Sequence, residues 1–368
     1  MSGLDEVVAG AAIVVCTGTG GVGKTTVTAA VGLEAARRGR RTVVVTIDPA
    51  KRLADAMGIG DLTDTPRRID GPGPGELWAT MLDTKSTFDA VVRKYAADAE
   101  QVDRILSNRF YRNISVTLSG TQEYMAMEKL YELHHESEFD LVVVDTPPTR
   151  HALDFIDAPR RLTRFLDHRL YRLLMAPTRG IVRAVNVAAQ AFLRTVSKVV
   201  GGEVIEDAIG FFQAFHGMEE GVRQRAEAVV ELLSADETAF VLVASPHRDT
   251  VSEASFFAVR LREAGIAVRA LVVNRMHPRF GSDPGGGSQP ELELDESLVD
   301  SLDGSPLGDH YRNLAEFRLV AAKEADHLEQ LRALVAPAPT VRVPFLPSDV
   351  HDLDGLAALG RYLFTRPD

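Results

Sequence analysis

A glycine-rich segment that ends in lysine and threonine is the first group of residues that could do chemistry. Residues 18–25 read Gly-Thr-Gly-Gly-Val-Gly-Lys-Thr and follow an apolar run. They match GxxxxGK[ST], a loop whose backbone N–H groups bind phosphate oxygens, whose lysine contacts the β- and γ-phosphates and whose last hydroxyl binds Mg²⁺. A plain strand-to-helix turn would have no use for Lys24 or Thr25. We therefore expect the chain to bind a nucleoside triphosphate.

Asp48 follows a second apolar run, 42–46, and precedes Pro49-Ala50. A carboxylate at the end of a strand next to the phosphate loop can orient the water that attacks the γ-phosphate. Asp48 could also cap a helix that starts at Pro49, and the two roles are compatible. We predict Asp48 and Lys24 as the catalytic residues.

Asp145 ends a further apolar run, 141–145, and is followed by Thr146-Pro147-Pro148-Thr149. An acid at the end of such a strand is the Walker B pattern, in which the carboxylate holds Mg²⁺. The two prolines restrict the next loop, as suits a segment that senses the γ-phosphate. We predict that Thr25 and Asp145 are the Mg²⁺ ligands.

The base of the nucleotide has weaker candidates. Asn274 ends the run 268–274 and could pair with an adenine edge, although an asparagine at a strand end is also a common turn residue. Pro344 and Phe345 could form an apolar wall beside it. The predicted nucleotide-binding residues are Gly20, Gly21, Val22, Gly23, Lys24, Thr25, Thr26, Asn274, Arg275, Pro344 and Phe345.

The elements that must position these residues are short apolar runs between helical stretches. Seven such runs are predicted strands, at 12–17, 42–46, 77–82, 141–145, 239–244, 268–274 and 340–343. Most are continuously apolar, which is typical of parallel strands covered on both faces. We predict an α/β fold, a doubly wound and mostly parallel sheet with ligands beyond the carboxyl ends of its strands.

Two stretches without strand signals, 87–136 and 160–233, predict a helical subdomain inserted into the nucleotide-binding domain. That domain would then consist of 1–86, 137–159 and 234–368, with a surface insertion at 281–309 that is rich in glycine and acids.

The composition excludes several classes of protein. The 368 residues are 45% hydrophobic and carry a formal net charge of −11, which disfavours nucleic-acid binding. Cys16 is the only cysteine, so a disulfide framework within one chain is excluded. Acidic residues stand where a signal peptide would carry positive charge, and we expect a cytoplasmic protein.

Together the motifs resemble those of the ATPase family that includes the arsenite-pump motors and the guided-entry factors for tail-anchored membrane proteins. This is a deviant P-loop branch related to the MinD/ParA ATPases. The resemblance covers nearly the whole chain. It rests on the loop 18–25, switch I at Asp48-Pro49-Ala50, switch II at 145–151, Gly120-Thr121-Gln122-Glu123 and Asn274. It implies an ATPase that uses ATP and Mg²⁺, in which Asp48 polarises water and Asn274 contacts adenine. It also implies that ATP closes a dimer whose helical inserts form a hydrophobic groove.

Three departures from the family pattern bear on this. Thr19 stands where the family usually carries a lysine that reaches the partner's phosphates, and such a cation can be worth roughly 10³ or more in rate. A heterodimer with a lysine-bearing paralogue would complete the site. Otherwise an arginine substitutes, or the chain binds nucleotide with slow turnover, and these alternatives stay open. The single Cys16 disfavours both a zinc-bridged dimer and arsenite coordination. Arg150 replaces a switch II glycine and could add a cation to the site.

The stretch 160–198 holds nine arginines and lysines and one acid, interleaved with apolar residues. Such a stretch can face a membrane, an acidic partner or the rim of an apolar groove, or can pack on neighbouring helices with its cations in solvent. The leading hypothesis is a dimeric ATP-hydrolysing switch with a hydrophobic client or membrane-protein segment on its helical side. The alternatives are a MinD/ParA-like membrane-positioning ATPase and an ATP-binding regulatory subunit.

Overall fold

A computed structural model describes residues 3–48, 51–71, 73–112, 121–135, 138–147, 149–168, 202–278 and 304–364. Its centre is an eight-stranded sheet with the order β3-β4-β2-β5-β1-β6-β7-β8. The strands are β1 (Ile13–Gly18), β2 (Arg41–Thr46), β3 (Arg67–Ile69), β4 (Glu76–Met81), β5 (Leu141–Asp145), β6 (Thr238–Ala244), β7 (Val268–Met276) and β8 (Thr340–Pro344). All neighbours are parallel except β3, which pairs antiparallel with β4. The predicted α/β fold with a mostly parallel sheet is confirmed.

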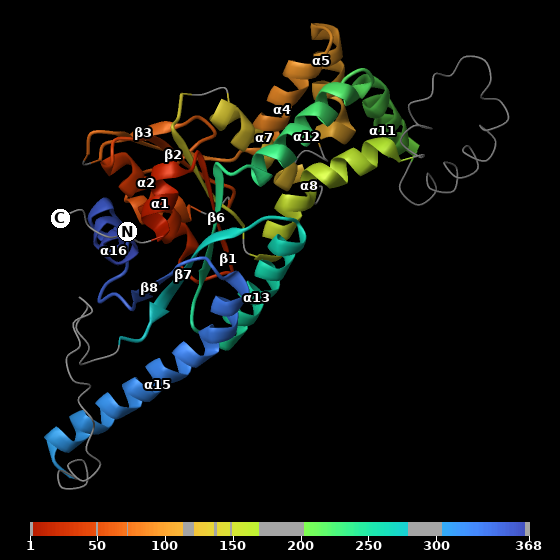
Figure 1. Ribbon diagram of the computed structural model, residues 1–368. Helices are drawn as coiled ribbons and strands as arrows, with labels where there is room; N and C mark the ends of the chain where they lie inside the picture. The colour runs from red at the N-terminus through yellow and green to blue at the C-terminus, as the bar shows by residue number, and fades with distance from the viewer. Residues whose placement is uncertain are drawn as a thin grey trace.

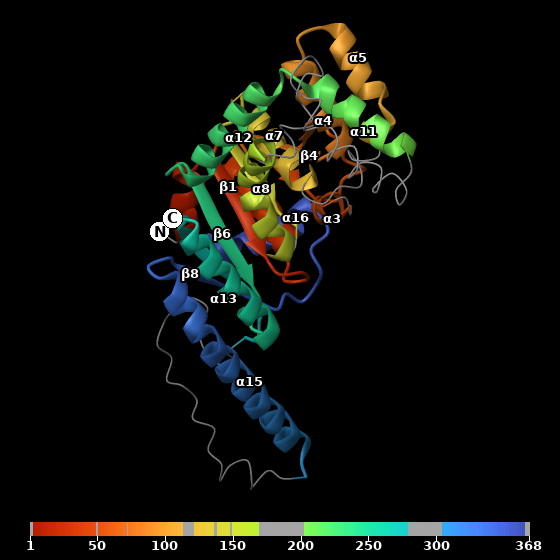
Figure 2. The ribbon, with the colours of Figure 1, turned by 90° about the vertical axis from the view of Figure 1, so that its right-hand side faces the viewer.

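The helices lie on both faces of the sheet (Figures 1 and 2). In the described ranges they include α1 (Gly3–Gly10), α2 (Lys24–Arg37), α3 (Arg52–Met57), α4 (Thr84–Tyr95), α5 (Ala99–Ser107), α7 (Thr121–His135), α8 (Thr149–Asp167), α11 (Gly202–Phe215), α12 (Glu219–Ser234), α13 (Arg248–Glu263), α15 (Pro306–Val335) and α16 (Leu353–Leu363).

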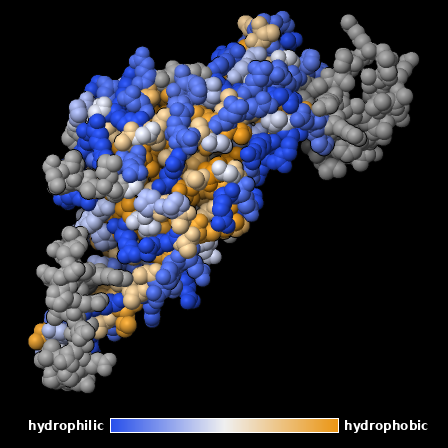
Figure 3. Space-filling model, viewed as in Figure 1, coloured by the Kyte–Doolittle hydropathy of each residue, from blue (hydrophilic) through white to orange (hydrophobic). Residues whose placement is uncertain are grey.

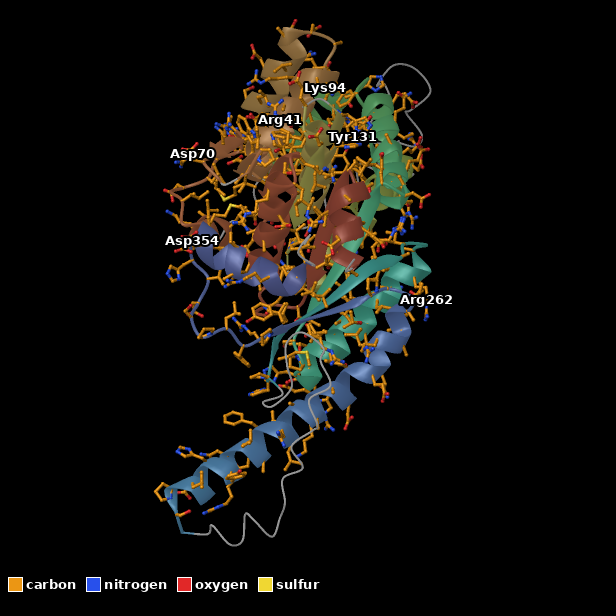
Figure 4. All side chains as sticks on the ribbon, turned by 60° about the vertical axis from the view of Figure 1, so that its left-hand side comes forward. Arg41, Asp70, Lys94, Tyr131, Arg262 and Asp354 are labelled. Carbon is orange, nitrogen blue, oxygen red and sulfur yellow. The ribbon has the colours of Figure 1, made fainter. Side chains whose placement is uncertain are left out.

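Each face of the sheet has its own buried core. The first core includes alternate residues of β1, such as Ile13 and Val15, and residues of α7, α12 and α13. The second core includes the intervening β1 residue Val14 and residues of α1, α2 and α16. Figure 4 shows Arg262 at the end of α13 on one side of the sheet and Asp354 on α16 on the other. Two covered faces explain why the central strands β1, β5 and β6 are buried at every position.

Helices α4, α5, α7, α11 and α12 gather at one end of the molecule, with part of α8 (Figure 1). Their apolar residues, among them Leu130 and Phe211, belong to the same buried cluster as the sheet residues Ile13 and Val144. The predicted helical subdomain therefore corresponds to helices that share a core with the sheet. The domain boundaries stay a prediction.

Helix α15 extends away from the body of the molecule (Figures 1 and 2). Its buried leucines and valine, Leu328, Leu331 and Val335, are in its second half. Ser305 caps its N-terminus by accepting a hydrogen bond from the N–H of Gly308, and Pro306 is its first residue. The helix thus begins inside the range 281–309 that the sequence marked as an insertion. Most of that range lies outside the described residues.

All seven predicted strands are present, with ends that differ by at most two residues. The sequence analysis missed α1 and the three-residue edge strand β3. Most of the basic stretch 160–198, the residues Pro49, Ala50 and Pro148, and the side chain of Arg150 lie outside what the structure describes.

Candidate nucleotide site

The parallel register brings three strand ends together. Cys16 of β1 and Thr46 of β2 are both level with Asp145, because β5 lies between β1 and β2. The carboxyl ends of these strands lead into the glycine-rich loop, switch I and switch II. Residues far apart in the sequence therefore meet at one edge of the sheet, where open α/β sheets bind ligands.

The glycine-rich loop leads directly into α2, which begins at Lys24. Gly23 precedes the helix with φ 84°, and Gly21 has φ 78°, both in the left-handed region that favours glycine. A Cβ atom on Gly23 would lie 2.3 Å from Nδ2 of Asn274. The glycine is therefore required by both its dihedral angle and its neighbour. The loop and the N-terminus of α2 form the kind of site that binds phosphates.

Asp145 is the centre of a buried polar cluster. Its Oδ1 accepts a hydrogen bond from Nζ of Lys24 at 2.8 Å, and its Oδ2 accepts from Oγ1 of Thr25 at 2.8 Å and of Thr46 at 3.2 Å. Nζ of Lys24 also donates to the carbonyl oxygen of Thr146. The side chain of Asp145 is fully buried and that of Lys24 is 9% exposed. The predicted residues Lys24, Thr25 and Asp145 are thus in direct contact.

Asp48 lies two residues beyond Thr46, at the end of β2. Its N–H donates to Oγ1 of Thr46 at 3.3 Å, and its Oδ2 forms an ion pair with NH1 of Arg52 at 2.9 Å. The Thr46 hydroxyl thus contacts both Asp145 and Asp48, and connects switch I to the buried cluster.

The end of β7 contacts the glycine-rich loop from outside. Nδ2 of Asn274 donates to the carbonyl oxygen of Val22 at 2.8 Å, and NH1 of Arg275 donates to that of Gly21 at 2.9 Å. Oδ1 of Asn274 accepts from the N–H of Arg275 at 2.9 Å. Both polar atoms of the Asn274 side chain are therefore engaged within the protein.

The residues predicted as the wall of the base lie beside this contact. Pro344 is level with Met276, and the N–H of Phe345 donates to the carbonyl oxygen of Met276 at 2.9 Å. Phe345 is 49% exposed, and its ring lies edge-on to the His277 ring, with 5.3 Å between centroids. His277 is held by Glu324 of α15, which accepts from its backbone N–H at 2.9 Å and contacts Nδ1 at 2.6 Å.

Thr19 occupies an unexpected position. Its side chain is 3% exposed, and its Oγ1 has no hydrogen-bond partner within the described residues. A side chain placed in this way is buried within its own chain. Gly20, Gly21 and Arg275 are the exposed residues at this end of the loop.

Cys16 is fully buried in β1. Burial raises the pKa of its thiol from 9.0 to about 12, and the nearby Asp145 acts in the same direction. A thiol in this state is protonated and inert.

The sequence analysis missed two residues of this site. Thr46 is buried and bonds Asp145, but a threonine at a strand end carries no motif of its own. Gln122 of α7 donates from Nε2 to the carbonyl oxygen of Ile47 at 3.1 Å, directly before Asp48. Gln122 was noticed only as part of the Gly-x-x-Glu stretch. Glu123, the last residue of that stretch, is 7% exposed. Thr26, one of the predicted nucleotide-binding residues, is half-buried in the first turn of α2.

The donor set suits a nucleotide with Mg²⁺. Loop amides, a lysine, a threonine hydroxyl and a buried carboxylate are what a magnesium triphosphate requires. Within the described residues no cluster of three or more histidine, cysteine or acidic side chains could hold a metal by itself. Mg²⁺ is usually bound by one or two protein groups together with phosphate oxygens, and Thr25 and Asp145 match that pattern.

Comparisons with known proteins agree with this site. The family model described as anion-transporting ATPase matches residues 11–295. "Putative arsenical pump-driving ATPase 1" of Aquifex aeolicus (strain VF5) is 20% identical over 96% of this chain and 78% of its own length. "Putative arsenical pump-driving ATPase 2" of the same organism is 24% identical over 75% of this chain and 84% of its own length. "ATPase get3" of Aspergillus terreus is 24% identical over 72% of this chain and 74% of its own length.

Proposed function

The chain belongs to the anion-transporting ATPase family, and on that premise we propose that it is a dimeric switch driven by ATP binding and hydrolysis. A single observation carries the proposal: Lys24 and Thr25 of the phosphate loop both contact the buried Asp145 carboxylate. These groups form one hydrogen-bonded cluster. An ATP·Mg²⁺ complex would replace contacts that the three side chains now make with one another.

Each residue of the cluster has a proposed task. The loop N–H groups and Lys24 bind the phosphates, and Thr25 and Asp145 hold Mg²⁺, whose charge neutralises the phosphate oxygens during transfer. Asp48 orients the attacking water, and the ion pair with Arg52 holds its carboxylate in place. Thr46 keeps switch I in contact with Asp145.

Asn274, Arg275, Pro344 and Phe345 lie together at the ends of β7 and β8, which supports a base site there. The exposed Phe345 ring offers an apolar face for stacking.

The proposed coupling to a client starts at Gln122. Its amide donates to the carbonyl oxygen of Ile47 and so joins α7, one of the helices at the far end of the molecule, to switch I. A displacement of switch I on hydrolysis would act on α7 directly. Apolar surface gathers in a band across the middle of the molecule in Figure 3. None of the described helices has both the length and the apolar character to cross a bilayer.

The proposal also covers the partner subunit and the client. Relatives named as arsenical pump-driving ATPases support an ATP-driven partner for a pump. The hydrophobic or membrane-protein client is what the family resemblance adds to the proposal. The two Aquifex relatives support a dimer, either of identical chains or with a lysine-bearing paralogue. A cytoplasmic location and a membrane-positioning role for the basic stretch stay predictions.

The burial of Thr19 favours a second candidate function. Since its buried side chain presents no cation to another subunit, the chain could act as a regulatory subunit that binds ATP and contributes chiefly structure to a partner. Turnover of the purified chain, alone and with its paralogue, distinguishes the two candidates. A dimeric switch hydrolyses ATP with its own Asp48, whereas a regulatory subunit binds ATP with no turnover of its own.

Asp48→Asn tests the catalytic assignment. The amide cannot polarise water as a carboxylate does, so we expect unchanged ATP affinity and a loss of turnover of at least about a hundredfold. Asp55→Asn is the matched control, because Asp55 is exposed on the neighbouring helix α3 and should leave turnover unchanged. Hydrolysis by Asp48→Asn at the wild-type rate would remove Asp48 from the proposed mechanism.

A further inference from the structure

Arg52, the first residue of α3, carries an exposed guanidinium beside the acid that is proposed to orient water. Its NH1 donates to Oδ2 of Asp48 at 2.9 Å, one helical turn away in the sequence. The Arg52 side chain is 62% exposed, and that of Asp48 is 19% exposed. An ion pair so open to solvent contributes only about 0–1 kcal/mol to stability. The pair therefore places two charges beside the site and does little to hold the fold together.

The backbone that carries Arg52 is fixed by its neighbours. Leu53 and Met57 of α3 are buried in the core that also contains Val22 of the glycine-rich loop. The start of α3 thus packs in one core with the loop that is proposed to bind the phosphates. Because the guanidinium itself lies in solvent, it can contact a ligand without unpacking that core.

The charges of the site explain why a cation is needed at this place. Asp145 pairs with Lys24 at 2.8 Å. Without Arg52 the counter-charges would be Lys24 and the metal, both at Asp145, and Asp48 would repel the terminal phosphate that it has to face. Thr19 is neutral and buried, so that position supplies no charge. Arg52 offsets the charge of Asp48 where the terminal phosphate would lie.

The guanidinium has more donors than its bond to Asp48 uses. It carries five N–H groups in a planar fork, and the bond to Asp48 comes from NH1. Arginine binds phosphate oxygens well because two of its N–H groups can donate in parallel. A bond to Asp48 and a contact with a phosphate can therefore exist together. One guanidinium would then bridge the acid that orients the water and the phosphoryl group that the water attacks.

We propose that Arg52 is a further catalytic residue, whose guanidinium contacts the γ-phosphate during transfer and supplies from within the chain the cation that the neutral Thr19 lacks. The proposal rests on the hydrolytic function proposed above. In hydrolysis a bond forms between the water oxygen and the γ-phosphorus, while the bond from that phosphorus to the bridging oxygen breaks and its electron pair stays on ADP. Asp48 accepts a hydrogen bond from the water, and the water's proton ends on the released phosphate. Arg52 stabilises the negative charge on the equatorial oxygens of the transferred group.

The test measures kcat and ATP affinity of the purified full chain for variants of Arg52. Arg52→Ala removes the whole guanidinium. Arg52→Gln removes the charge but keeps N–H donors that can still bond Asp48, so it preserves a role that only positions this acid. Arg52→Lys restores one charge. Lys51→Gln is the matched control, because the neighbouring Lys51 is 68% exposed and pairs with Asp61.

Both Arg52→Ala and Arg52→Gln should lower kcat at least about a hundredfold, since an arginine at the transferred phosphoryl group can contribute about 10³-fold or more. ATP affinity should change by less than about threefold, because the contact strengthens only in the transition state. Arg52→Lys should recover part of the loss, and Lys51→Gln should turn over like the wild type.

Added guanidinium ion separates a catalytic from a structural role. At concentrations too low to unfold the protein, it should raise the kcat of Arg52→Ala, whereas sodium chloride at the same ionic strength should not. A residue that only held Asp48 in place through the backbone of α3 would not give this rescue.

Two results would overturn the inference alone. Wild-type turnover of Arg52→Gln would leave Arg52 as a residue that only holds Asp48. A loss in Lys51→Gln as large as that in Arg52→Gln would show that the charge at position 52 has no special role. A wild-type chain that bound ATP without turnover would overturn the inference and the hydrolytic switch together, in favour of the regulatory subunit. A wild-type chain that bound no ATP would overturn the nucleotide site itself.

Discussion

Replacement of Lys24 by methionine should destabilise the protein in the absence of any nucleotide. Nζ of Lys24 lies 2.8 Å from Oδ1 of Asp145, and the two side chains are 9% and 0% exposed. Removal of one partner from a buried ion pair costs about 3–5 kcal/mol, because the other charge stays buried without compensation. The Asp145 carboxylate keeps its bonds from Thr25 and Thr46, each worth about 1 kcal/mol, so we expect a loss near the lower limit, about 3 kcal/mol.

Urea denaturation measures this loss. With a slope of roughly 3 kcal/mol per M for a large domain, the midpoint of Lys24→Met should fall by about 1 M. The double variant Lys24→Met/Asp145→Asn removes both charges and should recover much of the loss. Lys51→Met is the control, because Lys51 pairs with Asp61 on the surface, where both side chains are mostly exposed, and its midpoint should match the wild type. A midpoint for Lys24→Met as high as that of Lys51→Met would refute the idea that the cluster is a buried, charged centre.

Three further changes test other parts of the site. Gly23→Ala should lower ATP affinity at least about tenfold in a binding titration. The new Cβ would lie 2.3 Å from Nδ2 of Asn274, and the residue would have to keep a φ of 84°. Affinity equal to the wild type would show that the loop adapts. Gln122→Leu should lower kcat about fivefold with ATP affinity unchanged, since it removes one hydrogen bond to Ile47; an unchanged kcat would separate α7 from switch I. Burial raises the pKa of Cys16 to about 12, so its thiol should resist alkylation at pH 8 until the protein is denatured. Between pH 9 and 12 the thiol ionises in the unfolded chain but not in the folded one, so the free energy of unfolding should fall as the pH rises. This fall should be smaller in Cys16→Ala, which has no thiol.

The sheet could be predicted from the sequence because its signals are local. Continuous apolar runs between helical stretches are typical of parallel strands, and all seven were found in this way. The strand β3 has three residues, of which only Ile69 is buried, so its pattern is too short to detect. Ser305 and Pro306 are typical residues at the start of a helix. They lie within 281–309, which was predicted as a surface insertion from its glycines and acids, so the start of α15 was missed.

The candidate site could be predicted only where a residue belongs to a motif. Lys24, Thr25 and Asp145 have motif positions, and the structure brings them together. Thr46 and Gln122 act through tertiary contacts, with Asp145 and with the carbonyl of Ile47, and no local pattern marks such partners. Asn274 was predicted as a base contact from its residue type, whereas its bond to the carbonyl oxygen of Val22 depends on tertiary structure and could not be predicted; its contact with adenine stays a prediction.

The most direct test of the central claim is a crystal structure of the chain with Mg²⁺ and a non-hydrolysable ATP analogue. The account predicts that Nζ of Lys24 leaves Asp145 for the phosphates, that the Thr25 hydroxyl and the Asp145 carboxylate face the metal, and that Asp48 faces the terminal phosphate. A nucleotide bound away from the loop, with the contact between Lys24 and Asp145 intact, would contradict it.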